Sequence, residues 1–180
     1  MMKVHPSLQE IALNRRGGKE KQSMFVSLRS YAARKAELED IINVRIPKNK
    51  HDLEITRAEG ALREHGRHQD AKATQRVLLR RSEELSRLLA QADPTDFSNV
   101  DCNVTGMGTQ VTFTAPKNRT VVYTILGAWD SVPEENIVAY SSKLGAKLIG
   151  HSVGDKLRLP LEMGGTPVMM TIKSIAPAPK

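Results

Sequence analysis

Between residues 24 and 94, apolar positions recur at intervals of three and four residues. In the first part of this segment the recurring positions are Leu28, Tyr31, Leu38 and Ile42, with Lys35 as a polar member of the same seam. In the second part they are Ala71, Thr74, Leu78, Arg81, Leu85, Leu88 and Ala92. This spacing is typical of helices that bury one stripe, so the pattern predicts two consecutive helices.

Proline and glycine residues divide the helical segment. Pro47 interrupts the first run and predicts a kink or a new first helical turn. Gly60 separates the two runs, and Asp93-Pro94-Thr95 ends the second. Two helices with heptad-like seams and a short turn between them form an antiparallel coiled-coil hairpin. With a rise of 1.5 Å per residue, each arm reaches roughly 40–50 Å.

From Asp101 onwards the pattern changes to that of strands. Alternating residues in 108–113 and 121–126 predict a β-hairpin around Pro116-Lys117-Asn118. Two more strands are predicted at 156–159 and 168–172, and a short helix at 142–149. The fold class is therefore α+β, with a helical hairpin over 24–94 and a small antiparallel sheet domain with one short helix over 101–176.

Composition narrows the range of partners and compartments. The 180 residues carry a formal charge of +7, which favours an acidic partner such as nucleic acid, an anionic membrane or an acidic protein surface. No apolar run approaches the roughly 18–20 residues needed to cross a bilayer, so no membrane association is expected. A lone cysteine, Cys102, excludes an internal disulfide and fits the cytoplasm. Residues 1–23 are predicted to be a basic N-terminal extension.

Short motifs along both segments resemble one protein family in order and spacing. In the hairpin they are Ser27-Leu28-Arg29, Glu37-Leu38, Val44-Arg45, Pro47, Arg57, Gly60, Leu62, Glu64, Ala71, Lys72 and Gln75. In the second domain they are Tyr123-Thr124-Ile125-Leu126-Gly127, Ser142-Lys143-Leu144-Gly145, Leu148-Ile149-Gly150 and Gly154-Asp155. Taken together, the chain resembles the Gre family of bacterial transcription elongation factors, the GreA/GreB-like proteins.

The resemblance implies a function that is carried out on another enzyme. The hairpin would enter the secondary channel of bacterial RNA polymerase, and an FKBP-like second domain would dock at the channel mouth. At the family's hairpin tip, an Asp and a Glu three residues later help to hold Mg²⁺ at the polymerase active site, where backtracked RNA is cut. Such a protein is not itself an enzyme and has no cofactor of its own, although it shares the Mg²⁺ of the polymerase.

The tip of this chain departs from that pattern. Ala61 stands at the position of the Asp, whereas Glu64 is retained. A methyl group cannot ligate a metal, so we expect weak or absent stimulation of transcript cleavage, with Glu59 as a substitute ligand on the other side of the turn. Glu64 also has a simpler interpretation, an exposed acid stabilised by the positive end of a helix. The remaining tip residues are Gly60, Leu62 and Arg63.

A basic stripe on the second arm leaves two interpretations open. It consists of Lys72, Arg76, Arg80 and Arg87. The resemblance implies contact with nascent RNA, whereas a charged stripe opposite an apolar seam is also typical of a solvated face. An alternative function is a basic coiled-coil protein that binds DNA or RNA without polymerase. A monomer is expected under the first function.

Overall fold

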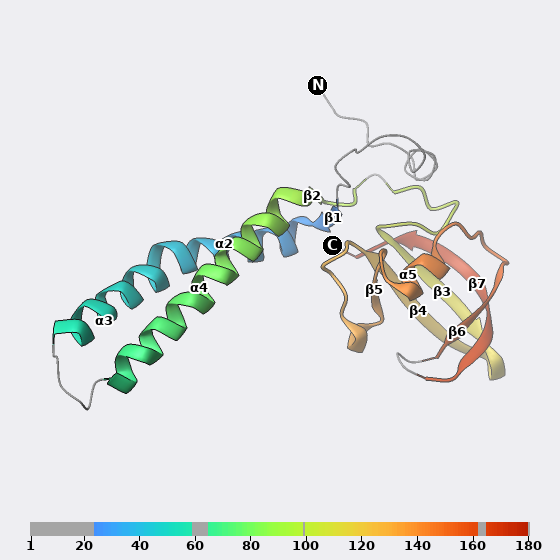
Figure 1. The fold of residues 1–180 in the computed structure, drawn as a ribbon. Helices are drawn as coiled ribbons and strands as arrows, with labels where there is room; N and C mark the ends of the chain where they lie inside the picture. The colour runs from blue at the N-terminus through green and yellow to red at the C-terminus, as the bar shows by residue number, and fades with distance from the viewer. Residues whose placement is uncertain (1–23, 59–64, 99, 162–164, 180) are drawn as a thin grey trace, which may run out of the picture. The chain divides into compact units, whose positions relative to one another are not determined.

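The computed structural model describes residues 24–58, 65–98, 100–161 and 165–179 (Figure 1). The chain divides into two compact units, one made of Leu28–Pro94 and the other of the remaining residues on either side. Among the described residues, no helix is long and apolar enough to cross a membrane.

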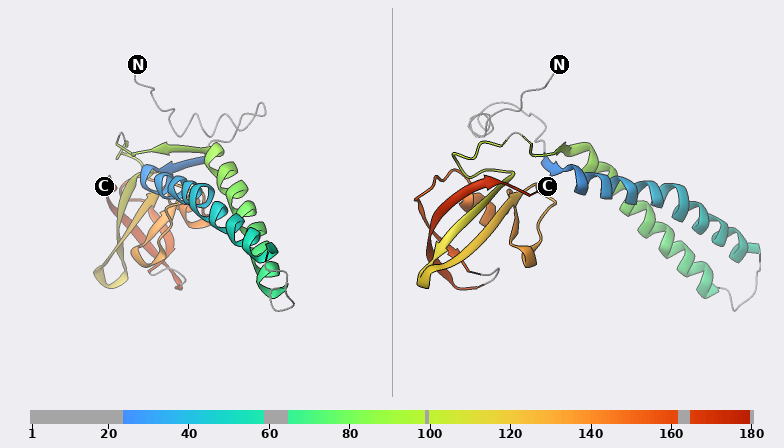
Figure 2. Two further views of the ribbon diagram at one scale, coloured as in Figure 1. Left: turned by 90° about the vertical axis from the view of Figure 1, so that its left-hand side faces the viewer. Right: turned by 180° about the vertical axis from the view of Figure 1, so that it is seen from behind.

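The first unit is the predicted helical hairpin. Its first arm consists of α2 (Leu28–Asp40), a π-helical turn (Ile41–Arg45) and α3 (Ile46–Ala58), and its second arm is α4 (His65–Gln91). Figure 2 shows α4 running beside α2 and α3 in both of its views. The 27 residues of α4 correspond to a length of about 40 Å, as expected.

The buried seam of the hairpin differs from the predicted one on the first arm. Leu85 is buried as predicted. Ile41 is buried in place of the predicted Ile42, and both Ile42 and the predicted Leu28 are largely exposed. On α4, Thr74 is exposed and Gln75 is half-buried instead. The seam of the first arm continues beyond the π-helical turn through Ile46, Asn49, Leu53 and Thr56.

The π-helical turn explains how the seam of the first arm continues beyond Ile41. It contains one residue more than an α-helical turn, and the N–H of Ile46 donates to the carbonyl of Ile41, five residues earlier. The buried stripe therefore moves from Ile41 to Ile46 in one step, which a regular three-and-four spacing cannot describe. Pro47 follows at once, so the predicted interruption is a wide turn and not the end of the helix.

The second unit contains a mixed five-stranded sheet in the order β5-β4-β3-β7-β6. The strands are β3 (Thr109–Ala115), β4 (Arg119–Leu126), β5 (Ile137–Ala139), β6 (Lys156–Pro160) and β7 (Pro167–Pro177). Neighbouring strands are antiparallel except for β5, which runs parallel to β4. The predicted strands and the β3–β4 turn are confirmed, and Lys117 and Asn118 of that turn adopt positive φ angles of 61° and 60°.

One face of the sheet carries the core of this unit. Inward-facing residues alternate along β3 and β4, and the rings of Phe113 and Tyr123 meet edge to face with centroids 6.1 Å apart. The predicted short helix is α5 (Lys143–Leu148), and Leu148 belongs to the buried cluster. Ser142 caps this helix by accepting a hydrogen bond from the Gly145 amide at 3.0 Å.

Two short strands, β1 (Met24–Ser27) and β2 (Ala92–Thr95), lie at the two ends of the segment 24–94, where the prediction of helix was therefore wrong. β1 packs against the loop after β4, where the Ala128 amide donates to the Phe25 carbonyl at 2.9 Å. A Cβ atom on Gly127 would lie 2.6 Å from the Val26 Cα, so only glycine allows this close approach. Asp130 accepts hydrogen bonds from both the amide and the hydroxyl of Ser27.

Candidate functional site: the hairpin tip and its basic face

The described ends of the hairpin arms meet close to the tip. Thr56 Oγ1 on α3 and His68 Nδ1 on α4 are 3.1 Å apart, and the Thr56 hydroxyl also lies 2.9 Å from the Asp52 carbonyl. This contact holds the two arms together within one or two turns of the connecting segment. The predicted tip residues lie outside the described part of the chain: Glu59, Gly60, Ala61, Leu62, Arg63 and Glu64.

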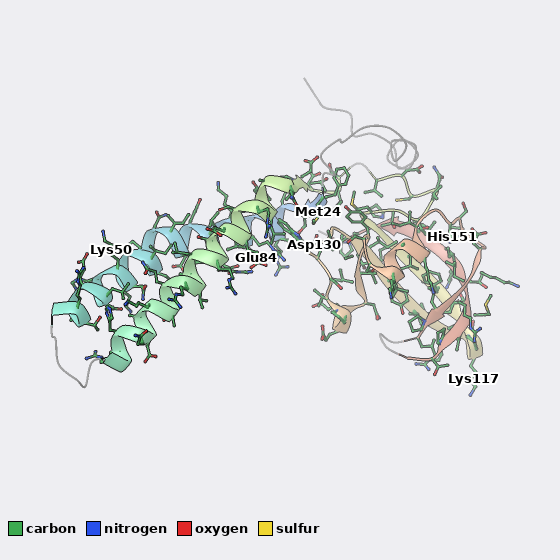
Figure 3. All side chains as sticks on the ribbon, viewed as in Figure 1. Met24, Lys50, Glu84, Lys117, Asp130 and His151 are labelled. Carbon is green, nitrogen blue, oxygen red and sulfur yellow. The ribbon has the colours of Figure 1, made fainter. Side chains whose placement is uncertain are left out.

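The basic stripe lies on α4 as predicted, with all four of its side chains exposed. These are Lys72, Arg76, Arg80 and Arg87. The stripe is not uniformly basic, because Glu83 and Glu84 lie between Arg80 and Arg87. One open hollow on the surface of α4 is lined by Arg80, Glu83, Glu84 and Arg87, of which Glu84 is labelled in Figure 3. Local positive charge is therefore concentrated on the three residues nearer the tip, where successive side chains are four residues apart.

An ion pair crosses the seam farther from the tip. The Arg81 guanidinium donates from Nε and Nη2 to the two carboxylate oxygens of Glu37, at 2.8 and 3.0 Å, and from Nη1 to Glu84 at 3.1 Å. The hydrogen bond from Arg81 is the main cause that lowers the pKa of Glu37 below its usual value. The hydrogen bonds that Arg81 donates to Glu37 and Glu84 raise the pKa of Arg81. This bidentate geometry fixes the lateral position of α4 against α2.

A second crossing contact involves a buried amide. Asn49 on α3 is only 6% exposed, and its Nδ2 donates to the Ala71 carbonyl on α4 at 3.1 Å. Its Oδ1 is buried without a protein partner among the described residues. A buried polar group in the seam favours one alignment of the two helices over others, because a shift of the helices would also break the hydrogen bond of its Nδ2.

Sequence reasoning missed Asn49 and the partner of Arg81. The pattern of apolar residues includes Arg81 in the seam, but nothing in that pattern selects Glu37 as its partner. Asn49 lies two residues after Pro47, where the predicted interruption conceals the continuing seam. The signal that would have found it is the five-residue step from Ile41 to Ile46.

Metal-binding chemistry is not assembled within the described residues, where no group of three or more His, Cys, Asp or Glu side chains lies close enough to hold an ion. The predicted metal ligands lie outside these residues, at the hairpin tip. Of its two family positions, only Glu64 carries a carboxylate.

Comparison with known proteins identifies the family. The model described as "Transcription elongation factor, GreA/GreB, C-term" matches residues 100–177, and the one described as "Transcription elongation factor, N-terminal" matches residues 24–93. This chain belongs to the GreA/GreB family. Members of this family bind bacterial RNA polymerase and stimulate cleavage by the polymerase without being catalysts themselves. The chain is accordingly a transcription elongation factor of the Gre type.

Two GreA proteins agree with this assignment, and one solved structure is similar. Transcription elongation factor GreA of Treponema pallidum is 31% identical over 140 residues, which cover 76% of this chain and 85% of that protein. GreA of Oenococcus oeni is 29% identical over 143 residues, or 79% of this chain and 88% of that protein. The solved structure of GreA factor homolog 1 of Thermus thermophilus is 17% identical, covers 86% of this chain and 99% of that chain, and superposes with a TM-score of 0.39.

Proposed function

We propose that this Gre-family chain inserts its hairpin into the secondary channel of bacterial RNA polymerase and regulates elongation or the rescue of backtracked complexes. In this proposal it stimulates transcript cleavage weakly or not at all. The observation that carries the second part is Ala61, which stands where the family pattern has an Asp. We further expect it to act as a monomer in the cytoplasm, where the polymerase transcribes.

The chemistry of the tip supports weak cleavage. Mg²⁺ takes oxygen ligands, usually one or two carboxylates together with waters, and supplies an activated water when it is bound near the scissile phosphate. Ala61 contributes no oxygen, so Glu64 would be the only carboxylate at the two family positions, with Glu59 as a substitute beyond Gly60. The chain therefore offers only half of the family's carboxylate ligands for Mg²⁺ at these positions, and we assign no step of RNA cleavage to it.

Nearby positive charge also disfavours the binding of Mg²⁺ at the tip. Arg57 and Arg67 are exposed on the described ends of the two arms, and Arg63 lies between Ala61 and Glu64 in the sequence. Positive charge near the tip lowers the attraction for a cation, and a guanidinium can pair with the remaining carboxylate. Together with the missing Asp, this favours a factor that occupies the channel without supplying a full set of metal ligands.

Transcript cleavage by a purified backtracked complex tests the proposal. Bacterial RNA polymerase stalled on a backtracked RNA is incubated with Mg²⁺ and with the unmodified chain, with Ala61→Asp or with Ala61→Asp/Glu64→Ala. We expect little cleavage above the polymerase's own rate with the unmodified chain and a gain of at least tenfold with Ala61→Asp. The double variant should lose that gain, because the restored pair again lacks one carboxylate.

The same experiment can contradict each part of the proposal. Strong cleavage with the unmodified chain that disappears in Glu64→Ala would show that one tip carboxylate is sufficient. A lack of gain in Ala61→Asp, combined with tight binding of that variant to the polymerase, would show that the tip does not reach the active site.

A second candidate function rests on the charge. The exposed residues Lys72, Arg76 and Arg80, with the net charge of +7, are also what direct binding to bare nucleic acid requires. In that case binding to free RNA or DNA would be strong at moderate salt and would fall steeply as salt is raised, and purified polymerase would show no response. Family membership favours the polymerase, so we place this function second.

A further inference from the structure

The middle of the hairpin exposes four aliphatic side chains to solvent. The exposed fractions are 48% for Ile42, 56% for Val44, 66% for Val77 and 45% for Leu79. Ile42 and Val44 lie in the π-helical turn, and Val77 and Leu79 lie on α4. The buried seam and the ion pair with Glu37 do not use them. We call these four residues the aliphatic belt.

All four lie at one level along the hairpin. Glu37 contacts Arg81 on one side of this level, and Asn49 contacts Ala71 on the other side. Because the two arms are antiparallel, the residues between these two contacts on the first arm lie opposite those between them on α4. Residues 42–44 and 77–79 both fall in these intervals, and the π-helical turn packs against α4.

Two members of the belt point to one flank of the hairpin. Ile42 follows buried Ile41 by one residue, and Leu79 follows half-buried Leu78 by one residue. One residue along a helix turns the side chain by about 100° from the seam. The arms run in opposite directions, so the same turn carries Ile42 and Leu79 to the same flank.

The other two members point to the opposite flank. Val77 precedes Leu78 by one residue and lies one turn from Arg81, which reaches across to Glu37 on this flank. On the first arm, Val44 follows Glu37 by about two turns. The belt therefore has one aliphatic pair on each flank, Val44 with Val77 and Ile42 with Leu79.

A partner that covers one flank does not account for this arrangement. A stable dimer interface buries about 800 Å² on each partner, and two half-exposed aliphatic side chains provide only a small part of that area. A second copy of the chain placed on either flank would also leave the other pair in water. Only a partner that surrounds the hairpin covers both pairs at once.

We propose that the aliphatic belt contacts, on both flanks, apolar residues that line the polymerase channel enclosing the hairpin. This inference rests on the proposed function and adds a specific contact to it, one that is separate from the tip and from the basic stripe. The belt holds the hairpin at a fixed depth, because its four side chains leave water only when they reach the matching apolar part of the channel wall.

Paired substitutions on each flank test the belt. The variants are Val44→Gln/Val77→Gln, Ile42→Gln/Leu79→Gln and all four together. A matched control is Leu28→Gln/Ile55→Gln, which changes two aliphatic side chains of the hairpin, 52% and 41% exposed, that lie outside the belt. Far-UV circular dichroism and thermal unfolding show whether each variant keeps its helices. Binding to purified bacterial core polymerase is measured by fluorescence anisotropy with a label at the C-terminus.

We expect each flank variant to weaken binding about tenfold, the fourfold variant to weaken it about a hundredfold, and the control to stay within about twofold. A loss confined to one flank would overturn the enclosing partner, as would a dimer of the unmodified chain in sedimentation that a flank variant dissociates. If the unmodified chain binds and all belt variants bind equally well, the belt proposal alone fails. If the unmodified chain does not bind the polymerase, the proposed function fails with it.

Discussion

At the scale of single residues, the hairpin contains a buried amide in which only one of the two polar atoms has a hydrogen-bond partner among the described residues. Asn49 donates to the Ala71 carbonyl, but its Oδ1 has no protein partner among the described residues. Replacing a buried polar group of this kind by an apolar one of similar volume is often neutral or stabilising, whereas placing a charge there costs several kcal/mol. The free-energy cost of burying this amide is compatible with a role in selecting one alignment of the arms.

Substitution of Asn49 separates the free-energy cost of its buried amide from the role of that amide in aligning the arms. We expect Asn49→Leu to raise the free energy of unfolding of the hairpin by about 1 kcal/mol and Asn49→Asp to lower it by about 3 kcal/mol at pH 7. Urea unfolding followed by the helical circular dichroism signal measures both. Exposed Asn43→Leu serves as a control and should change the free energy by less than about 0.5 kcal/mol. A lower stability of Asn49→Leu would mean that the amide makes a net stabilising contribution.

The ion pair between Glu37 and Arg81 predicts a dependence of stability on pH. Because the hydrogen bond from Arg81 lowers the pKa of Glu37 in the folded state, the pair stabilises the hairpin above the unfolded pKa. That contribution is lost as the pH falls through the lower folded-state pKa. Both side chains are more than a third exposed, so solvent screening limits the contribution to about 0.5–1 kcal/mol.

Unfolding between pH 7 and pH 3 tests this contribution. Glu37→Gln should lower stability at pH 7 and flatten its decrease towards acid, with little difference from the unmodified chain at pH 3. Glu39→Gln is the matched control, because Glu39 lies 3.9 Å from Lys35 and both side chains are about 60% exposed. Parallel pH profiles for the unmodified chain and Glu37→Gln would refute the role of the pair.

At the scale of secondary-structure elements, the π-helical turn and Pro47 depend on each other. In a regular helix, proline lacks one hydrogen-bond donor and its ring clashes with the carbonyl four residues earlier, at a cost of about 3 kcal/mol. Only Ile46 separates the wide turn over Ile41–Arg45 from Pro47, and we expect the turn to relieve this clash. It also brings Ile46 and Asn49 back to the buried side of the arm.

Deletion of one residue tests this dependence. Removing Asn43 converts the π-helical turn into an α-helical one and should destabilise the hairpin by about 3 kcal/mol, because Pro47 then lies within a regular helix. Combining the deletion with Pro47→Ala should restore most of that stability, whereas Pro47→Ala alone should have only a small effect. Equal losses in the deletion with and without Pro47→Ala, measured by thermal unfolding, would show that the turn does not serve the proline.

The elements also show how far the sequence alone could be interpreted. The periodicities of two and of three to four residues were sufficient for both helices, for β3, β4, β6 and β7, and for α5, because each buries one face of its own. β5 is three residues long, and its pairing with β4 comes from the tertiary fold, so no periodicity marks it. Ile46 and Asn49 were not predicted as seam residues because a single extra residue in one turn changes the side on which every later residue lies.

For the candidate site, the sequence is limited in a different way as a basis for prediction. Local spacing was sufficient to place Lys72, Arg76, Arg80 and Arg87 on one helix, since i and i+4 positions share a face. Contacts between the arms depend on how the helices are aligned, and periodicity carries no information about that alignment. Glu37 and Asn49 were therefore missed although both lie within a correctly predicted helix.

At the scale of the whole molecule, the distribution of charge along α4 predicts which residues contact RNA in the polymerase complex. Lys72, Arg76 and Arg80 are exposed and follow one another at intervals of four residues with no acid between them. Arg87 is separated from them by Glu83 and Glu84, which line one hollow together with Arg80 and Arg87. Neighbouring carboxylates lower the positive potential that attracts a phosphate, since charges of opposite sign this close largely cancel at a distance. The three residues nearer the tip should thus dominate any contact with nascent RNA.

Binding to two forms of the polymerase separates a contact with RNA from a contact with protein. We expect Lys72→Gln/Arg76→Gln/Arg80→Gln to bind core polymerase within about twofold of the unmodified chain and to bind a backtracked complex about tenfold more weakly. For single-stranded RNA, three lost phosphate contacts would reduce the slope of log affinity against log salt by about 2. Arg87→Gln should change neither measurement by more than twofold. Equal losses on both forms of the polymerase would instead assign the stripe to the channel wall, where it would act beside the aliphatic belt.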